Sequence, residues 1–225
     1  MLLVYRFLWL ASSLGTAAVL IMLSSSRQAP PVITGQWTNV QQGRFTLQIP
    51  QEFRAHRDAL TQMGMNKPNS PIQLQDAVRI ERGVRIGIQL ALVTRRTDLQ
   101  TSGDEPSTAS PQEPNPIQLL RQVHAAQLEN LRNAYADFKA NQNTRVQIQG
   151  VMGWRTDFEY TLPHWIPFFN MPVRGYLITL PVSQSEALHA IAYSPPHQLT
   201  EYQKVFERLL NTVRLNAGAT NSGGW

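Results

Sequence analysis

The sequence contains no cysteine among its 225 residues. Such a chain forms no disulfide, holds no metal through thiolates, and has neither a cysteine nucleophile nor an attachment residue for a c-type haem or a cysteine-linked lipid. Common catalytic motifs are missing from the sequence too. It has no glycine-rich phosphate loop, no pair of histidines at metal-ligand spacing and no Gly-x-Ser-x-Gly elbow. We therefore predict no catalytic residue, no cofactor and no metal site, and expect a protein that is not an enzyme.

The sequence also has little excess charge. Lysine and arginine number 20 and aspartate and glutamate 15, which gives a net charge of +5. Two of the basic residues, Arg6 and Arg27, lie in or beside the N-terminal segment, and the others are spread along the chain. Nucleic-acid-binding proteins concentrate basic residues on one face or in one tract, so we expect no nucleic-acid partner.

A long apolar segment opens the chain. Met1 to Leu23 is apolar except for Arg6 and a few small polar residues, and about twenty helical residues are enough to cross a hydrocarbon core of roughly 30 Å. We therefore expect residues 1–26 to form a single-pass signal anchor that leaves the rest of the chain on the extracytoplasmic side. The alternative is a cleaved signal peptide with Ser24 and Ser26 at the cleavage site, which would release a secreted or periplasmic protein.

The remaining residues divide into a domain and its flanking segments. Residues 27–43 have no periodicity and suit a tether, and the domain is expected to span residues 44–215. Inside it, residues 97–114 are rich in Ser, Thr, Pro, Asp and Glu and predict a mobile loop. Residues 216–225 predict a disordered tail.

Alternating apolar and polar residues predict the strands of this domain. One strand covers residues 44–49, a long one covers Val84 to Leu92, and a shorter one around Val78 and Ile80 precedes it, whereas residues 51–76 predict no firm element. Three further strands between Val151 and Tyr193 predict an antiparallel meander. In the first of these the apolar parity is that of Met152, Trp154, Phe158 and Tyr160, and Val146 and Ile148 extend it through a bulge at Gly150.

Two amphipathic helices complete the pattern. The first is expected from a cap at Asn115 to about Lys139, and His124, which lies on its apolar face, is interpreted as a core-edge histidine. The second is expected to open with Thr200 as its cap. The apolar stripes are Ile117, Leu120, Leu128, Leu131, Tyr135 and Phe138 in the first helix, and Leu199, Tyr202, Phe206, Leu209 and Val213 in the second. An antiparallel sheet flanked by amphipathic helices is an α+β fold.

Several of these segments together resemble the PsbP-like and DcrB-like type of extracytoplasmic domain. They are GRFTLQIP, the mid-chain helix, VQIQGVMGWRTDFEY, VRGYLITL, LHAIAYS and EYQKVFERLLNTVRL, which cover roughly residues 44–215. The resemblance implies an α/β/α sandwich, found in lumenal photosystem accessory proteins, bacterial envelope proteins and a nuclear-import factor. It also implies a mostly non-catalytic binding scaffold with no invariant catalytic residue.

One group of charged residues invites a chemical interpretation. Arg155, Asp157 and Glu159 share a strand face, and two neighbouring carboxylates can divide acid and base work as in glycosidases. Alternating charges on a solvated strand face are the simpler explanation. His189, on the third meander strand, could approach this pair, but we predict no catalytic triad.

The connection LPHWIPFFNMP, residues 162–172, is the most apolar stretch outside the N-terminus. Its three prolines predict a loop at one end of the sheet. Because Trp, Phe and Met are enriched at interfaces, we predict that it contacts a partner or a membrane. The contacting residues would be His164, Trp165, Ile166, Phe168, Phe169 and Met171. The alternative is that the loop folds back and buries these side chains in the core.

The sequence therefore suggests a membrane-tethered binding or assembly protein, periplasmic or thylakoid-lumenal, that serves as an accessory factor of a membrane protein complex. A carrier of a small apolar ligand is the alternative, and it would need a cavity of several hundred cubic ångströms. A hydrolase would need convergent polar side chains in a cleft.

Overall fold

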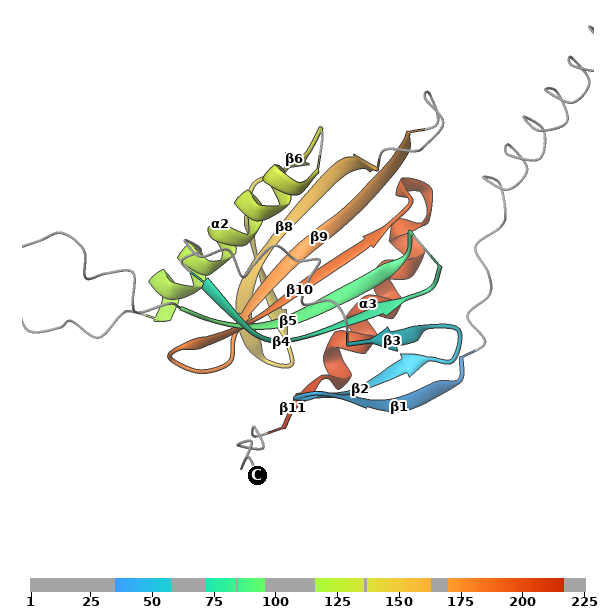
Figure 1. Ribbon diagram of the computed structural model, residues 1–225, viewed down its shortest axis with the longest axis horizontal. Helices are drawn as coiled ribbons and strands as arrows, with labels where there is room; N and C mark the ends of the chain where they lie inside the picture. Colours follow the sequence, from blue (N-terminus) through green and yellow to red (C-terminus); the bar gives the residue numbers. More distant parts are fainter. Residues whose placement is uncertain are drawn as a thin grey trace, which may run out of the picture. The chain divides into compact units, whose positions relative to one another are not determined.

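A computed structural model describes residues 35–57, 72–83, 85–95, 116–135, 137–162 and 170–216 of the chain (Figure 1). Its elements in chain order are β1 (Trp37–Gln42), β2 (Phe45–Pro50), β3 (Arg54–His56), β4 (Ile72–Glu81), β5 (Gly87–Arg95), α2 (Pro116–Ala134), β6 (Lys139–Ala140), β7 (Thr144–Ile148), β8 (Val151–Leu162), β9 (Met171–Pro181), β10 (Glu186–Ser194), the 3₁₀ turn η3 (Pro196–Gln198), α3 (Leu199–Thr212) and β11 (Arg214–Leu215).

These strands form two antiparallel sheets. The larger has eight strands, with seven in the order β3-β4-β5-β10-β9-β8-β6 and β7 also paired with β8. The smaller has the order β1-β2-β11. The predicted meander is confirmed, because β8 pairs with β9 and β9 pairs with β10, both antiparallel.

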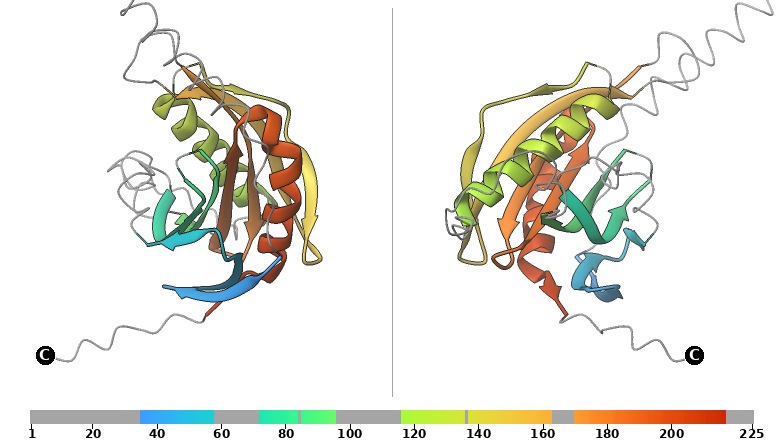
Figure 2. Two further views of the ribbon diagram at one scale, coloured as in Figure 1. Left: turned by 90° about the vertical axis from the view of Figure 1, so that its right-hand side faces the viewer. Right: turned by 60° about the vertical axis from the view of Figure 1, so that its left-hand side comes forward.

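The two helices cover opposite faces of the large sheet (Figure 2). Leu131 of α2 packs with Phe158, Val173 and Leu177 on one face, and successive strand residues point to the other face, toward α3. Central strands are therefore buried on both sides, as Leu90 and Ala91 in β5 show with no exposed surface. The expected fold class, an α+β domain with helices on both faces of an antiparallel sheet, is confirmed.

The apolar stripe of α3 is confirmed at Tyr202, Phe206 and Leu209, whereas Leu199 is half-buried and Val213 follows the end of the helix, and the stripe of α2 is correct only in part. Tyr202, Phe206 and Leu209 of α3 are at most 1% exposed. In α2, Leu120 and Leu131 are buried, but Ile117 is 64% exposed. Val123, which the predicted stripe omits, takes a buried place in the core with Ile72 and Val93.

The prediction of a tether through residue 43 is wrong for its last part. Trp37–Gln42 forms β1, which pairs with β2 along its whole length. The turn between them is fixed to the large sheet, since the backbone N–H of Arg44 donates to Oδ2 of Asp76 (2.5 Å). The sequence pattern does not predict β1 because this edge strand has no buried residue, so its apolar and polar residues do not alternate as they do in a strand with one face in the core.

Strand boundaries also differ in the first half of the domain. The stretch predicted to lack structure contains β3 and the start of β4. The strand predicted from Val84 begins at Gly87 instead, where β4 and β5 pair. Both faces of β4 are partly buried, and a register shift between Leu74 and Asp76 interrupts the alternation on which the prediction depended.

Three predicted ends or joints are wrong. Helix α2 stops at Ala134 because the chain turns to pair Lys139–Ala140 with β8. The predicted bulge at Gly150 is a tight turn between separate strands β7 and β8, in which Gln149 and Gly150 both have positive φ, as a two-residue hairpin turn requires. Helix α3 begins at Leu199, after Gln198, so Thr200 lies inside the helix and is not its cap.

Several predictions concern segments outside the described residues. These are the anchor at residues 1–26, the first part of the tether, the loop at 97–114 and all but the first residue of the tail at 216–225. In the described part of the chain, neither helix has the length and apolar character needed to cross a membrane.

Candidate functional site

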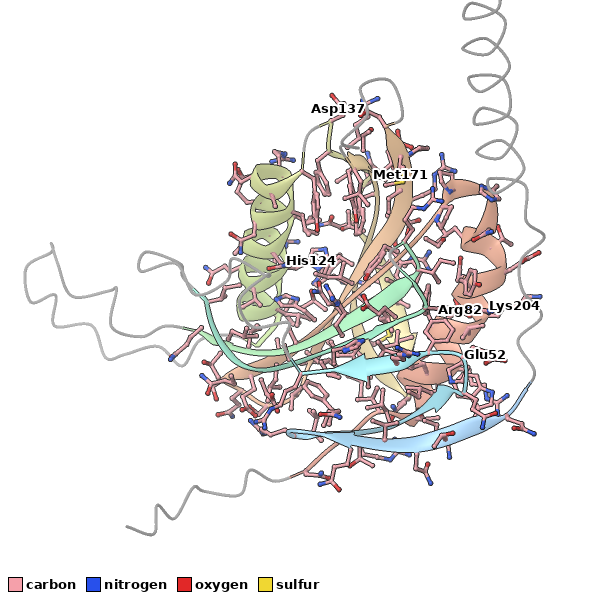
Figure 3. All side chains as sticks on the ribbon, turned by 45° about the vertical axis from the view of Figure 1, so that its right-hand side comes forward. Glu52, Arg82, His124, Asp137, Met171 and Lys204 are labelled. Atoms are coloured by element: carbon pink, nitrogen blue, oxygen red, sulfur yellow. The ribbon has the colours of Figure 1, made fainter. Side chains whose placement is uncertain are left out.

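The predicted partner-contacting residues are only partly described. His164, Trp165, Ile166, Phe168 and Phe169 lie outside the described residues, whereas Met171 is half-buried at the start of β9 and pairs with Leu162. Figure 3 places Met171 at the same end of the domain as Asp137, where α2 has just finished. The proposed contact role of this connection therefore stays a prediction.

The charged face of β8 forms ion pairs. Nε of Arg155 lies 2.8 Å from Oδ1 of Asp157, and the Arg155 guanidinium lies 4.3 Å from the centroid of the Tyr176 ring. Nη2 of Arg174 on β9 lies 3.3 Å from Oε2 of Glu159. Each carboxylate therefore has its own arginine, and both line an open cavity of about 400 Å³ on this face.

His189 and His124 meet in the core rather than at the charged face. His189 has no exposed surface, and His124, which points from α2 toward the sheet (Figure 3), is 1% exposed. Oγ1 of Thr179 lies between them, 2.9 Å from Nδ1 of His189 and 2.7 Å from Nδ1 of His124. On the other side of His124, Nε2 lies 2.8 Å from Oγ1 of Thr156. The interpretation of His124 as a core histidine is correct.

The direction of each hydrogen bond in this chain follows from counting protons. The Thr156 hydroxyl donates to Oδ1 of Asn143, so it must accept from Nε2–H of His124. Nδ1 of His124 then accepts from the Thr179 hydroxyl, whose oxygen accepts from Nδ1–H of His189. Both imidazoles are neutral in this arrangement. Burial agrees with it, because it lowers the pKa of His124 from 6.5 to about 4 and that of His189 to about 3.

Catalysis by these histidines is not favoured. A general base must reach the substrate, and here both imidazoles are sealed between α2 and the sheet. In the described part of the chain, no three His, Asp or Glu side chains gather where they could hold a metal ion.

Two further cavities on the described residues have mixed chemistry. One of about 150 Å³ lies between α2 and the sheet and is lined by Tyr135, Tyr160 and Tyr193 together with Gln89 and Gln127. An apolar cavity of that size holds about one benzene ring, and this one is partly polar. A wider groove of about 640 Å³ lies at the β3–β4 edge, where Glu81 pairs with both Arg79 and His56. Neither matches the large apolar cavity that a carrier of apolar ligands needs.

Exposed apolar side chains, by contrast, gather at one end of the domain. The large apolar residues with the most exposed surface in the described part of the chain are Ile117, Val151, Met152 and Val182. They belong to the start of α2, the β7–β8 turn and the β9–β10 turn, which lie at the same end of the large sheet (Figures 1 and 2). Two of them, Ile117 and Met152, line one depression, and exposed apolar surface of this kind marks interaction sites.

Trp154 lies beside Ile117 and Met152, and two arginines approach its ring. The guanidinium carbons of Arg121 on α2 and Arg145 on β7 each lie 5.7 Å from its ring centroid, within cation–π range. A shallow depression of about 110 Å³ beside the ring is lined by Ile117 and Met152, among others. We call Ile117, Arg121, Arg145, Met152 and Trp154 the Trp154 patch.

Among the described residues, neither Arg121 nor Arg145 forms an ion pair with a carboxylate, whereas Arg44, Arg79, Arg132, Arg155 and Arg174 all do. Both side chains are exposed. The patch therefore presents apolar surface together with two positive charges to a partner.

Sequence reasoning missed this patch for an identifiable reason. Met152 and Trp154 share the parity of Phe158 and Tyr160, which are core residues, and so they were assigned to the core. The available signal was the pair of arginines, because Arg121 lies on the helix face near the stripe and Arg145 lies opposite Trp154 in the hairpin.

Comparison with known proteins gives similarity of fold alone. No protein-family model matches the sequence, and neither does any curated protein. The solved structure of cyanobacterial PsbP (CyanoP) from Synechocystis is similar, with 7% identity, coverage of 84% of this chain and 97% of that chain, and a TM-score of 0.46. The Ran-binding protein Mog1p of Saccharomyces cerevisiae has 14% identity, coverage of 80% and 95%, and a TM-score of 0.41. LpqN, involved in cell envelope biogenesis of Mycobacterium tuberculosis, has 14% identity, coverage of 81% and 91%, and a TM-score of 0.40.

Proposed function

We propose that this protein is a non-catalytic binding or assembly protein that uses the Trp154 patch to hold a protein partner. Its N-terminal segment tethers it to a membrane with the domain on the extracytoplasmic side, periplasmic or thylakoid-lumenal, where it serves as an accessory factor of a membrane protein complex. The observation that carries the proposal is that the exposed Ile117 and Met152 lie beside Trp154, whose ring is approached by two arginines that have no carboxylate partner among the described residues.

The composition of the patch is that of a protein interface. Trp, Met and Arg are enriched at the centres of interfaces, and Trp and Arg are frequent among the residues whose truncation costs most binding energy. The half-buried Trp154 is held by its neighbours before any partner arrives, so little side-chain entropy is lost when it is covered. The patch thus offers a partner a tryptophan side chain that is already fixed in place and exposed apolar surface that binding can bury.

The competing functions find less support. A hydrolase would need an acid and a base free to act in an open cleft. The chain of His189, Thr179 and His124 is closed to solvent, and Asp157 and Glu159, which do line an open cavity, are each held in an ion pair with an arginine. A carrier would need a large apolar cavity, and the cavity under α2 is small and lined by phenol and amide groups.

A mild-detergent pull-down from membranes tests the binding role. The full chain carries Ile117→Ser and Met152→Ser together, and the matched control carries Gln122→Ser and Lys204→Ser, two exposed polar positions. We expect a protein captured by the wild type and by the control to be lost from the patch variant, with all three chains melting within a few degrees of one another. Equal capture by the patch variant would overturn the assignment of the patch.

The tether is tested separately. We expect the protein to stay in the membrane fraction with its N-terminal segment retained, because the apolar segment is long enough to span a bilayer. N-terminal sequencing of the mature protein that starts at Arg27 would show cleavage instead.

A further inference from the structure

We propose that the partner of the Trp154 patch supplies an extended segment of alternating acidic and apolar residues, which adds as a strand to the free edge of β7. This inference rests on the proposed function and gives the chemistry of the partner. It depends on three features of the described residues: an open sheet edge, its charge, and the apolar surface beside it.

The first feature is the open edge. In the described part of the chain, β7 pairs only with β8, so its other side presents backbone N–H and C=O groups. Thr144, Arg145 and Gln147 on this strand are exposed. Edge strands of this kind bind extended peptides through main-chain hydrogen bonds, and side chains at alternate positions give specificity.

The second feature is charge. The edge from Lys139 to Ile148 contains two basic residues and no acidic one. Arg145 does not extend away from the sheet as a purely solubilising edge residue would, since it lies over Trp154 on the face that α2 covers. Arg121 adds a second positive charge from α2 on the same ring. Carboxylates at alternate positions of an added strand would face these guanidinium groups.

The third feature is apolar surface next to the edge. Side chains of an added strand alternate between the two faces of the sheet, so when its carboxylates face Arg145 its apolar side chains lie on the opposite face. There they lie beside Val146, which is half-buried, and Val151, which is 39% exposed, and covering these two adds burial to the ionic contacts.

The same features argue against a second copy of this chain on the edge. Two β7 strands side by side would bring together two edges that carry basic residues and no acidic one, and like charges on paired strands are unfavourable. The acidic partner strand has no such conflict.

Binding of a synthetic probe tests the inference. The probe is a fluorescein-labelled, acetylated eight-residue peptide of alternating glutamate and valine, and its anisotropy is followed as the full chain is added in mild detergent. We expect saturable binding that weakens as salt is raised to about 0.15 M. We also expect Arg121→Ser with Arg145→Ser to weaken it at least about fivefold. Arg132→Ser, on the same helix but paired with Glu129, is the matched control and should bind like the wild type.

Two further probes separate strand addition from simple charge attraction. A lysine–valine peptide of the same length should not bind. In another glutamate–valine peptide, two adjacent central residues are replaced by proline, which removes one backbone N–H donor from each edge of the strand. This peptide should bind at least about fivefold more weakly than the unchanged peptide. Three outcomes would each overturn the inference. The proline peptide could bind as well as the glutamate–valine peptide, or the double arginine variant could bind the peptide as well as the wild type. The protein could also bind phosphatidylglycerol vesicles while it does not bind the peptide. Any of these outcomes would leave the pull-down test of the proposed function unaffected, so the two can fail separately.

Discussion

Oγ1 of Thr179 lies 2.7 Å from Nδ1 of His124, and this contact joins helix α2 to the middle of the large sheet. The same oxygen reaches Nδ1 of His189 at 2.9 Å, so one hydroxyl serves two buried imidazoles. Thr179 donates to Nδ1 of His124, which is possible only while His124 is neutral, and Nε2 of His189 has no hydrogen-bond partner among the described residues. Protonation of His124 therefore removes the acceptor that the Thr179 hydroxyl needs, and protonation of His189 puts a charge on a buried ring.

The first prediction follows from the pKa of His124, which burial lowers from 6.5 to about 4. Below pH 6.5 the unfolded chain binds a proton that the folded His124 does not, so the histidine's contribution to stability is lost as the pH falls from 6.5 to 4. His124→Gln removes this titration. We compare the free energy of unfolding of the wild type with that of the variant at each pH. The difference, wild type minus variant, should be about 2 kcal/mol smaller at pH 5 than at pH 7. Urea unfolding of both proteins across this range measures it, and a constant difference would mean that His124 is not a buried neutral group.

The second prediction concerns α3. Phe206 and Leu209 have no exposed surface. Changing either residue to alanine removes buried apolar contacts and leaves a cavity, at a cost on the order of 2–5 kcal/mol in the free energy of unfolding. Asn211→Ala, at an exposed position of the same helix, is the control and should stay within about 0.5 kcal/mol of wild type. A cost that small at Phe206 would contradict the burial of this face.

The third prediction concerns the close approach of β9 to its neighbours at Gly175. A Cβ there would overlap the carbonyl oxygen of Ala192 and lie 2.9 Å from ring carbons of Phe158. We expect Gly175→Ala to cost about 3 kcal/mol in denaturant unfolding, because backbone and ring must both move. Gly83→Ala is the comparison. Its Cβ meets no atom within 4 Å, and only its positive φ of 64° opposes the change, so the cost should be about 1 kcal/mol. Equal costs at the two positions would mean that β9 and β10 separate easily.

The fourth prediction concerns the connection between β8 and β9. Trp165→Ser with Phe168→Ser should weaken binding to the partner or to liposomes while leaving the melting temperature nearly unchanged, because we predict that these residues contact a partner or membrane. Thermal melting and liposome flotation of the same variant decide between the two interpretations. If melting drops by several degrees and binding is unchanged, the connection belongs to the core.

Part of this fold could be predicted because its signal is local. The alternation through Phe158 and Tyr160 and the spacing of Tyr202, Phe206 and Leu209 follow from backbone geometry, which points side chains to one face every second or every three to four residues. Where one face of a helix or strand is buried, the apolar residues of the sequence repeat with the period of that element. Strand β1 has no such repeat, since none of its residues is buried.

The candidate site depends on relations that no local pattern contains. The sequence by itself determined the α+β class, the meander and the buried face of α3, because each needs only the period of one element and its neighbours. Only the tertiary structure decided that Trp154, on the same strand parity as the core, lies half-exposed between Arg121 and Arg145. Likewise, only the packing of α2 on the sheet places His124 within reach of Thr179 and, through it, of His189. Exposure and hydrogen bonding depend on which distant segment covers a residue, and that is fixed only when the helices and strands have packed together.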